Sequence, residues 1–333
     1  MVKSKTLQST LDLINKSSNI LITSHTRPDG DACGSVRAMC DSLESLGKKV
    51  NPIFMSPLPE WYQFLFDNPV PILTDDVSPE QLHAGHYDEC DLIIIVDTNS
   101  YIQLPVFDKW LKTTDIPVLV IDHHVTGDGL GNVEVIDSTA AAAGEIVYEL
   151  IKFANWPITK PIAEAIFVAL ATDTGWFKFN NAGERIFTIA AELIKAGVSQ
   201  SDIYSRLYQN MSPARMKLMI RMLNSIELHH GNQIAFQTIM RKDFDETGAK
   251  GPDTENLIAE CQRLGTVKMA AMFVELADGG FRCSLRSKSK VDVQKIAKSY
   301  GGGGHIMASG VTLPGPIEKA KEMILAPVIE QLK

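Results

Sequence analysis

Three short apolar runs that each end in ionisable side chains constrain the fold most. The runs are ILITSH at residues 20–25, DLIIIVD at 91–97 and PVLVID at 117–122. Continuous apolar runs of this length are typical of strands buried on both faces, as in a parallel sheet. Segments with helical spacing lie around them, at residues 6–16, 32–46, 140–153, 160–172 and 182–196.

This alternation predicts an α/β fold in which a mostly parallel sheet is flanked by helices. In such sheets a ligand binds outside the carboxyl ends of the strands. The three runs end in His25, in Asp97 and in Asp122 followed by His123. We therefore expect these ionisable side chains to gather at one edge of the sheet.

The second half of the chain predicts a separate, smaller α/β unit. Residues 197–212 are more polar and indicate a connector, which continues as a helix over 213–229. Strands are expected at residues 233–240, 270–275 and 281–286, with a helix at 253–264. The predicted organisation is a metal-binding domain over residues 1–196, a helical connector over 197–229 and a substrate-binding domain over 230–333.

Charge and cysteine content narrow the class of protein. The net charge of −8 argues against a chain that coats nucleic acid by bulk charge, although residues 281–300 form a local basic stretch. The five cysteines are scattered and form no C-x-x-C pair, which argues against a zinc-thiolate site or a disulfide framework. Because we find neither a signal core nor a membrane-length apolar run, we expect a cytoplasmic protein without a membrane segment.

Carboxylates and imidazoles recur at the predicted ends of strands and helices. The residues are His25, Asp29 and Asp31 in HTRPDGD, Asp97, His123, and Asp173 in ATDTG. Taken singly, Asp29 and Asp31 are also compatible with turn and helix-capping positions. Taken together, the six suit Mn²⁺ or Mg²⁺, and the imidazoles favour Mn²⁺. A pair of divalent cations would remove the repulsion between so many carboxylates.

A run of glycines followed by histidine, residues 301–305, comes directly after the basic stretch. Successive glycines let a backbone approach a phosphate closely, whereas the simpler interpretation is a flexible turn. Fixing four glycines costs conformational entropy, which favours a function. Arg286 offers a charged fork for a phosphate, or is an ordinary solvated charge.

Together these motifs match a known pattern. HTRPDGD, IIIVD, IDHH and ATDTG are followed by SLRSKS and GGGGHIMASG. With this series the sequence resembles the DHH/DHHA1 phosphoesterases over nearly its whole length. Within that family it is similar to the bifunctional oligoribonucleases that also act on 3′-phosphoadenosine-5′-phosphate (PAP).

The resemblance implies two Mn²⁺ ions, with Mg²⁺ or Co²⁺ as substitutes. His25, Asp29 and Asp97 would hold one ion, and the other would take Asp31, Asp97, His123 and Asp173. His124 would contact the scissile phosphate and help to stabilise charge or to protonate the leaving oxygen, and Asp122 would orient this loop. The implied nucleotide-binding residues are Arg286, Gly303, Gly304 and His305.

The implied function is hydrolysis of short 5′-phosphorylated single-stranded RNA to mononucleotides and of PAP to AMP, by a two-metal hydroxide attack. A phosphodiesterase for linear or cyclic dinucleotides, such as pApA and c-di-AMP, uses the same two domains. A manganese pyrophosphatase shares the N-terminal motifs, but the glycine run argues against it. A nucleotide sensor without turnover is disfavoured because every ligand position is filled. Apolar surface on the connector is compatible with a homodimer.

Overall fold

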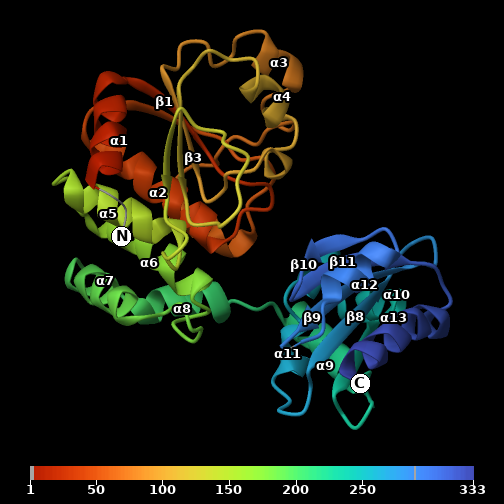
Figure 1. Ribbon diagram of the computed structural model, residues 1–333. Coiled ribbons are helices and arrows are strands. Elements are labelled where there is room, and N and C mark those ends of the chain that lie inside the picture. Colours follow the sequence, from red (N-terminus) through yellow and green to blue (C-terminus); the bar gives the residue numbers. More distant parts are fainter. Residues whose placement is uncertain (1–3, 289) are drawn as a thin grey trace. The chain divides into compact units, whose positions relative to one another are not determined.

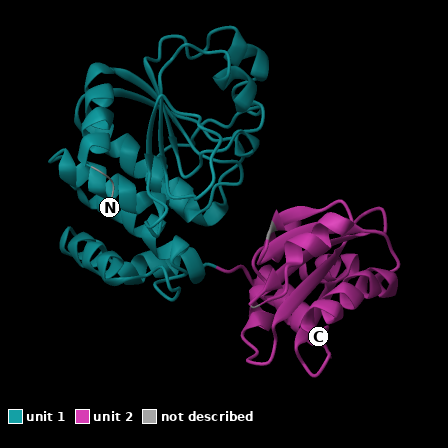
Figure 2. Cartoon of the chain, viewed as in Figure 1, with its two compact units in different colours: residues 1–210 teal, residues 211–333 magenta. Residues whose placement is uncertain are grey.

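The chain is described by a computed structural model that covers residues 4–288 and 290–333. It divides into two compact units, residues 1–210 and 211–333, each described by itself (Figure 2). The elements of the first unit are α1 (Ser4–Lys16), β1 (Asn19–Thr23), α2 (Gly30–Ser45), β2 (Lys49–Pro52), η1 (Glu60–Leu65), α3 (Pro79–His83), β3 (Leu92–Val96), η2 (Tyr101–Gln103), α4 (Phe107–Leu111), β4 (Val118–Asp122), β5 (Val133–Ile136), α5 (Ala143–Phe153), α6 (Lys160–Asp173), α7 (Glu184–Lys195) and α8 (Gln200–Tyr208).

The first unit is built on a five-stranded parallel sheet with the order β2-β1-β3-β4-β5. The prediction of a parallel α/β fold is confirmed. β1, β3 and β4, which carry the three apolar runs, lie side by side in the centre, and nearly all their residues are buried. Their carboxyl ends therefore meet at one edge. The edge strand β5, which has a mixed burial pattern, is not among the strands that the sequence predicts.

Alternate side chains of these strands enter two apolar cores, one on each face of the sheet. The core on one face also contains side chains of α1, α2, α5, α6 and α7, with α7 packed against α6, and the core on the other face contains side chains of α3 and α4 (Figure 1). The first set includes Ile20, Ile22, Ile94 and Ile121, and the second includes Leu21, Ile93, Ile95 and Val120. Burial on both faces explains why these strands have no polar alternation.

Glycines allow α2 and α6 to pack very closely. A Cβ atom on Gly34 would lie 2.3 Å from the carbonyl oxygen of Ala165, and one on Gly30 would lie 2.4 Å from the side chain of Thr172. Only a residue without a side chain permits this approach. The contact brings Asp31, near the start of α2, close to Asp173, the last residue of α6.

The second unit has a six-stranded sheet with the order β10-β11-β9-β8-β7-β6, in which only the β7–β8 pair is parallel. Its elements are α9 (Pro213–Asn224), β6 (Glu227–His229), β7 (Ile234–Ile239), α10 (Arg241–Thr247), η3 (Gly251–Thr254), α11 (Ala259–Gln262), β8 (Met269–Glu275), β9 (Phe281–Ser287), α12 (Val293–Ser299), β10 (Gly303–His305), β11 (Ala308–Leu313) and α13 (Ile317–Leu332). Helices α12 and α13 cover one face, and α9 and α11 cover the other. None of the helices described in either unit is both long and apolar enough to cross a bilayer.

Two predicted helices of this half are wrong in part. The helix expected over 213–229 ends at Asn224, because the following residues form β6 and pair with β7 through a turn in which His230, Gly231 and Asn232 have positive φ. The helix expected over 253–264 is reduced to η3 and the short α11. Asn256 between them has a φ of 59°, which a continuous right-handed helix does not allow.

Candidate metal centre

The loop after β1 presents His25 and Asp29. The ring Nδ1 of His25 lies 2.9 Å from the carbonyl oxygen of Thr26, which turns Nε2 toward Asp97 Oδ2 at 3.2 Å. Asp29 is the N-cap of α2, since its Oδ1 accepts hydrogen bonds from the backbone N–H groups of Asp31 and Ala32. The same Oδ1 lies 3.9 Å from His25 Nε2, so the capping carboxylate also faces the cluster.

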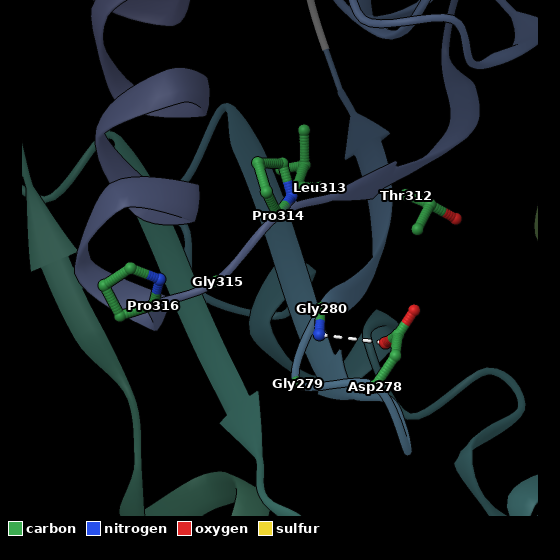
Figure 3. Close-up of a pocket in the computed structure, with 8 residues that line it drawn as sticks. All are labelled: Asp278, Gly279, Gly280, Thr312, Leu313, Pro314, Gly315 and Pro316. Atoms are coloured by element: carbon green, nitrogen blue, oxygen red, sulfur yellow. Dashed lines mark hydrogen bonds between the residues drawn. The ribbon is translucent and has the colours of Figure 1, made fainter.

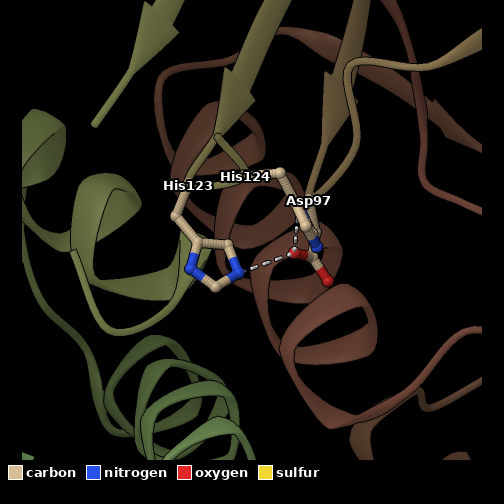
Figure 4. A group of neighbouring side chains, drawn as sticks. All are labelled: Asp97, His123 and His124. Carbon is tan, nitrogen blue, oxygen red and sulfur yellow. Dashed lines mark ion pairs between the residues drawn. The ribbon is translucent and has the colours of Figure 1, made fainter. Parts of the chain in front are cut away.

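Asp97 occupies the centre of the cluster, directly after β3. Its backbone has a φ of 60°, a region that non-glycine residues seldom adopt, and its side chain is almost fully buried. Oδ1 has no hydrogen-bond partner among the described residues, although the Nε2 of His123 lies 3.5 Å away (Figure 4). A buried carboxylate oxygen without a partner is costly, and a bound cation would satisfy it.

Asp31 is buried, and its carboxylate faces the N-terminus of α5. Its Oδ2 accepts the backbone N–H of Ala143 at 2.6 Å, and its Oδ1 accepts that of Gly144 at 2.9 Å. The hydroxyl of Ser35 donates a third hydrogen bond at 3.1 Å. Two of these donors belong to the free N–H groups of a helix N-terminus, which stabilise a negative charge.

His123 connects Asp31 with the end of α6. Its Nδ1 lies 3.3 Å from the carbonyl oxygen of Ala140, and its Nε2 points into the cluster. That Nε2 is 3.7 Å from Asp31 Oδ2 and 3.6 Å from Asp173 Oδ2. With Asp97 included, one imidazole nitrogen therefore faces three carboxylates from three different parts of the chain.

His124 lies at the rim, and Asp122 holds it. Asp122 Oδ1 accepts the backbone N–H of His123 at 2.8 Å, and the ring Nδ1 of His124 lies 2.7 Å from the same oxygen. The His124 side chain is 52% exposed, whereas Asp122 is fully buried. Because the Nδ1 proton is held by a carboxylate, the Nε2 of His124 is left for other partners, and the hydrogen bond raises the pKa of His124 despite its partial burial.

The two imidazoles beside Asp97 hold protons near neutral pH. Burial alone would lower the pKa of His25, but the hydrogen bond and charge of Asp97 outweigh it and raise the pKa to about 9. The same opposition, again with Asp97 as the main partner, raises the pKa of His123 to about 9. In turn, the two imidazoles outweigh the burial of Asp97 and lower the pKa of its carboxyl group.

Two further carboxyl groups, those of Asp31 and Asp173, have raised pKa values, in contrast to Asp97. Burial, followed by the charge of Asp97, raises the pKa of Asp31 well above its ordinary value. Burial also raises the pKa of Asp173 to about 6, although His123 opposes the change. Raised pKa values favour the protonated, neutral form of these two carboxyl groups. A divalent cation would favour the carboxylate form and displace the protons.

All six predicted ligands lie in this cluster. The ligand atoms of the six, together with those of His124, form groups in which every pair is within 4.8 Å, namely His25–Asp29–Asp97, Asp31–His123–Asp173 and Asp97–His123–His124. Carboxylate oxygens and imidazole nitrogens fit Mn²⁺, Mg²⁺ and related divalent ions. The donor set and the buried Asp97 oxygen that lacks a hydrogen bond among the described residues agree that these residues suit bound divalent cations.

The predicted nucleotide-binding residues lie in the second unit, at one end of its sheet. Ala308 of β11 pairs with Arg286 of β9 on one side and with His305 of β10 on the other. A Cβ on Gly304 would lie 2.5 Å from the Ala308 carbonyl oxygen, so close strand pairing already requires glycine there. Gly303 is exposed in the same strand, and the His305 side chain lies outside the described part of the structure.

A pocket in the second unit lies at the opposite end of β9 and β11 (Figure 3). Its lining residues are Asp278, Gly279, Gly280, Thr312, Leu313, Pro314, Gly315 and Pro316. Its one carboxylate, Asp278, accepts the backbone N–H of Gly280 at 3.0 Å, as in an ordinary turn. This lining has no cluster of ionisable groups, so we do not assign a reaction to the pocket.

Sequence reasoning missed the backbone groups that hold the side chains of the candidate metal centre. Residues 140–144, which we call the alanine segment, supply the carbonyl for His123 and the N–H groups for Asp31. The sequence predicts only a helix over 140–153, whereas α5 begins at Ala143. A run of four alanines before glycine carries no chemical signal, so only the structure could show this role.

Comparisons with known proteins match two parts of the chain to two family models. Residues 19–171 match the DHH family, N-terminal domain, and residues 231–333 match the DHHA1 domain. The bifunctional oligoribonuclease and PAP phosphatase NrnA of Thermus thermophilus is 29% identical over 94% of this chain and 90% of its own. The Bacillus subtilis protein of the same name is 28% identical over 88% of this chain and 89% of its own. The crystal structure of an exopolyphosphatase-related protein from Bacteroides fragilis superposes with a TM-score of 0.91 at 24% identity, covering 99% of this chain and 97% of that one.

Proposed function

We propose, from the premise that this chain belongs to the DHH/DHHA1 phosphoesterases and is a hydrolase of phosphoester bonds, that it is a Mn²⁺-dependent enzyme. Its proposed substrates are short 5′-phosphorylated oligoribonucleotides, released as mononucleotides, and PAP, converted to AMP. The names of the two NrnA relatives, which match nearly the whole chain, support this choice.

The observation that carries the proposal is the position of Asp97. Its buried carboxylate lies between two ligand groups, with Oδ2 facing His25 and Oδ1 facing His123. One carboxylate that serves two neighbouring groups is the arrangement expected of a paired metal centre. A centre built from a single ion would need no such shared ligand.

In the proposed centre, His25, Asp29 and Asp97 hold one ion, and Asp31, Asp97, His123 and Asp173 hold the other. The ions, when bound, supply an activated water at neutral pH and positive charge for the phosphoryl oxygens. The chain itself positions the ligands: α5 binds Asp31, and the Ala140 carbonyl directs His123.

His124 is the proposed catalytic residue beside the ions. Asp122 holds its Nδ1, so that Nε2 can donate a hydrogen bond to a phosphoryl oxygen or a proton to the leaving oxygen. Partial exposure of His124 leaves room for a substrate, and the pKa raised by Asp122 keeps the ring protonated nearer to neutral pH. Asp122 acts through His124 and is a positioning residue.

The second unit is the proposed nucleotide-binding domain. Arg286, Gly303, Gly304 and His305 share one end of its sheet, which supports a joint role in binding a phosphate or a base. Burial lowers the pKa of Arg286, but the guanidinium remains charged at any physiological pH. Arg286 is thus a cation available for a phosphate.

The test is a hydrolysis assay with metal-stripped protein that is reloaded with Mn²⁺. PAP, a 5′-phosphorylated RNA dinucleotide, cyclic di-AMP, a long single-stranded RNA and pyrophosphate are offered at equal concentration. We expect AMP from PAP and mononucleotides from the dinucleotide, with little product from the other three. The His124→Gln variant should lose turnover, while a His83→Ala variant, changed at an exposed histidine on α3, should retain it.

Three outcomes would contradict the proposal. Phosphate released only from pyrophosphate would make the protein a pyrophosphatase and remove the nucleotide-binding role of the second unit. Nucleotide binding without turnover in saturating Mn²⁺ would make it a sensor. Rapid cleavage of cyclic di-AMP, with none of PAP, would shift the substrate class to cyclic dinucleotides.

A further inference from the structure

Three backbone groups of the alanine segment contact the proposed metal ligands directly, and a fourth connects it to another ligand through Asn181. The Ala140 carbonyl meets the His123 ring, and the N–H groups of Ala143 and Gly144 bind Asp31. The carbonyl of Ala141 accepts a hydrogen bond from the Asn181 amide, which also donates to the Asp173 carbonyl. One short segment therefore contacts or connects three of the proposed ligands.

A further N–H group of the segment shows what holds it in place. Glu145 Oε2 accepts the N–H of Ala141 at 2.7 Å, so this side chain folds back over the start of its own helix. The other oxygen, Oε1, lies 2.7 Å from Arg185 Nε on α7. Arg185 also pairs with Glu149, one turn further along α5.

Burial makes this pair unusual. The Glu145 side chain is only 5% exposed, and Arg185 is 35% exposed. A buried carboxylate is retained in a fold only if it is paired and hydrogen-bonded, and Glu145 meets both conditions. An apolar residue would fill the same place without the cost of burying a charge. We therefore attribute the glutamate at this position to its hydrogen bond with the Ala141 N–H.

We propose that the Glu145–Arg185 ion pair is a positioning device for the metal centre, which holds the alanine segment so that Asp31 and His123 meet the same ion. This inference rests on the proposed function, because it assumes that these residues bind a metal. Glu145 touches neither reacting atoms nor the proposed ligands and acts only through the backbone. Groups that bind metal ligands directly typically change metal affinity by about 10- to 100-fold when they are replaced, and for Glu145, which acts through the backbone, we expect the lower end of that range.

The chain offers a matched control. Lys152 and Glu192 also form an ion pair between α5 and α7, at 2.9 Å. Glu192 accepts a further hydrogen bond from Tyr148, so its partners lie along the middle and end of α5 rather than at the alanine segment. Removing either pair loosens the same two helices, but only one pair contacts the segment that supports the ligands.

The experiment measures Mn²⁺ binding to metal-stripped, full-length protein by isothermal titration calorimetry and by electron paramagnetic resonance. The variants are Glu145→Gln, Arg185→Met, Arg185→Lys and Lys152→Met, and each is also assayed for its thermal midpoint. We expect Glu145→Gln and Arg185→Met to weaken one class of Mn²⁺ sites about tenfold. Arg185→Lys should recover part of the affinity, and Lys152→Met should bind Mn²⁺ like the parent protein.

The outcomes separate the two proposals. If the parent protein binds no Mn²⁺, the proposed function fails. If the parent binds Mn²⁺ and Glu145→Gln binds it equally well, the positioning role is refuted. Equal losses of affinity in Arg185→Met and Lys152→Met would also refute it, since the effect would then reflect general loosening of α5 and α7. Should Glu145→Gln fail to fold, the Mn²⁺ affinities of Arg185→Met and Arg185→Lys, changed at a partly exposed position, are compared with that of Lys152→Met instead.

Discussion

Replacing Gly34 by alanine should separate the two helices that carry Asp31 and Asp173. The added Cβ would lie 2.3 Å from the Ala165 carbonyl oxygen and 2.9 Å from the Ala169 backbone nitrogen. Ordinary contact begins at 3.4 Å, so the helices must move apart by about 1.1 Å, the difference between 3.4 and 2.3 Å. Both nearby atoms belong to the backbone of α6, which cannot rotate away as a side chain can.

The displacement affects stability and chemistry together. Overpacking of this kind costs about 1–3 kcal/mol of the free energy of unfolding. For a unit of 210 residues each kcal/mol lowers the thermal midpoint by roughly 2–4 °C. Asp31 lies three residues before Gly34, and Asp173 lies four after Ala169, so the ligands move with the helices. A misplacement of about 1 Å can lower activity by about 100-fold.

The assay compares kcat/KM for PAP in saturating Mn²⁺, Mn²⁺ affinity and the thermal midpoint. Gly265→Ala is the control, because Gly265 is exposed, lies in the second unit and has open space within 4 Å of the position that an added Cβ would occupy. We expect Gly34→Ala to lose activity and affinity while the control retains both. A Gly34→Ala protein with the parent's kcat/KM and thermal midpoint would refute the argument that this helix contact sets the ligand geometry.

Three further predictions follow from the site. Asp97→Asn should reduce the number of bound Mn²⁺ ions from two to one or none in calorimetry, and full stoichiometry would contradict its shared position. Asp122→Asn should lower the pKa of His124 and reduce kcat on the order of 100-fold with little change in KM, and an unaltered pH profile of kcat would argue against this role. Without metal, the thermal midpoint should fall as pH rises from 6.5 to about 9, because His25 and His123 bind more protons in the folded than in the unfolded protein over that interval. Added Mn²⁺ should oppose this fall, and a midpoint that rises with pH in metal-free protein would contradict the assigned pKa directions.

Local sequence predicted that the proposed ligands lie together, because the segments that carry them have strong local signals. Asp97 and His123 directly follow strands whose continuous apolar runs are typical of the centre of a parallel sheet. The carboxyl ends of neighbouring parallel strands must share an edge, so side chains far apart in sequence could be brought together by topology alone. Asp29 shows that two interpretations of one residue can hold at once, since it caps α2 and faces His25.

Local periodicity predicted the wrong secondary structure where pairing with a distant strand determines the conformation. Residues 227–229 continue a helical pattern, yet they form a strand because their backbone pairs with β7. Just after the helix ends, the Ser225 hydroxyl donates a hydrogen bond to the Thr238 carbonyl and accepts one from the Thr238 N–H. The glycines before His305 suggested a loop that approaches a phosphate. In the structure, Gly304 allows β10 to pair closely with β11. The contact between the glycines and a phosphate therefore stays a prediction.

The sequence by itself determined which carboxylates and imidazoles are candidate metal ligands and at which edge they gather, because strand burial and the acids at the strand ends are local properties. Only the tertiary structure decided how those ligands are held. The close contact at Gly34, the alanine segment and the Glu145–Arg185 pair join parts of the chain that carry no mutual signal. Backbone groups bind Asp31 and His123 there, and a backbone group is the same in every residue, so its partner becomes visible only when the chain is folded.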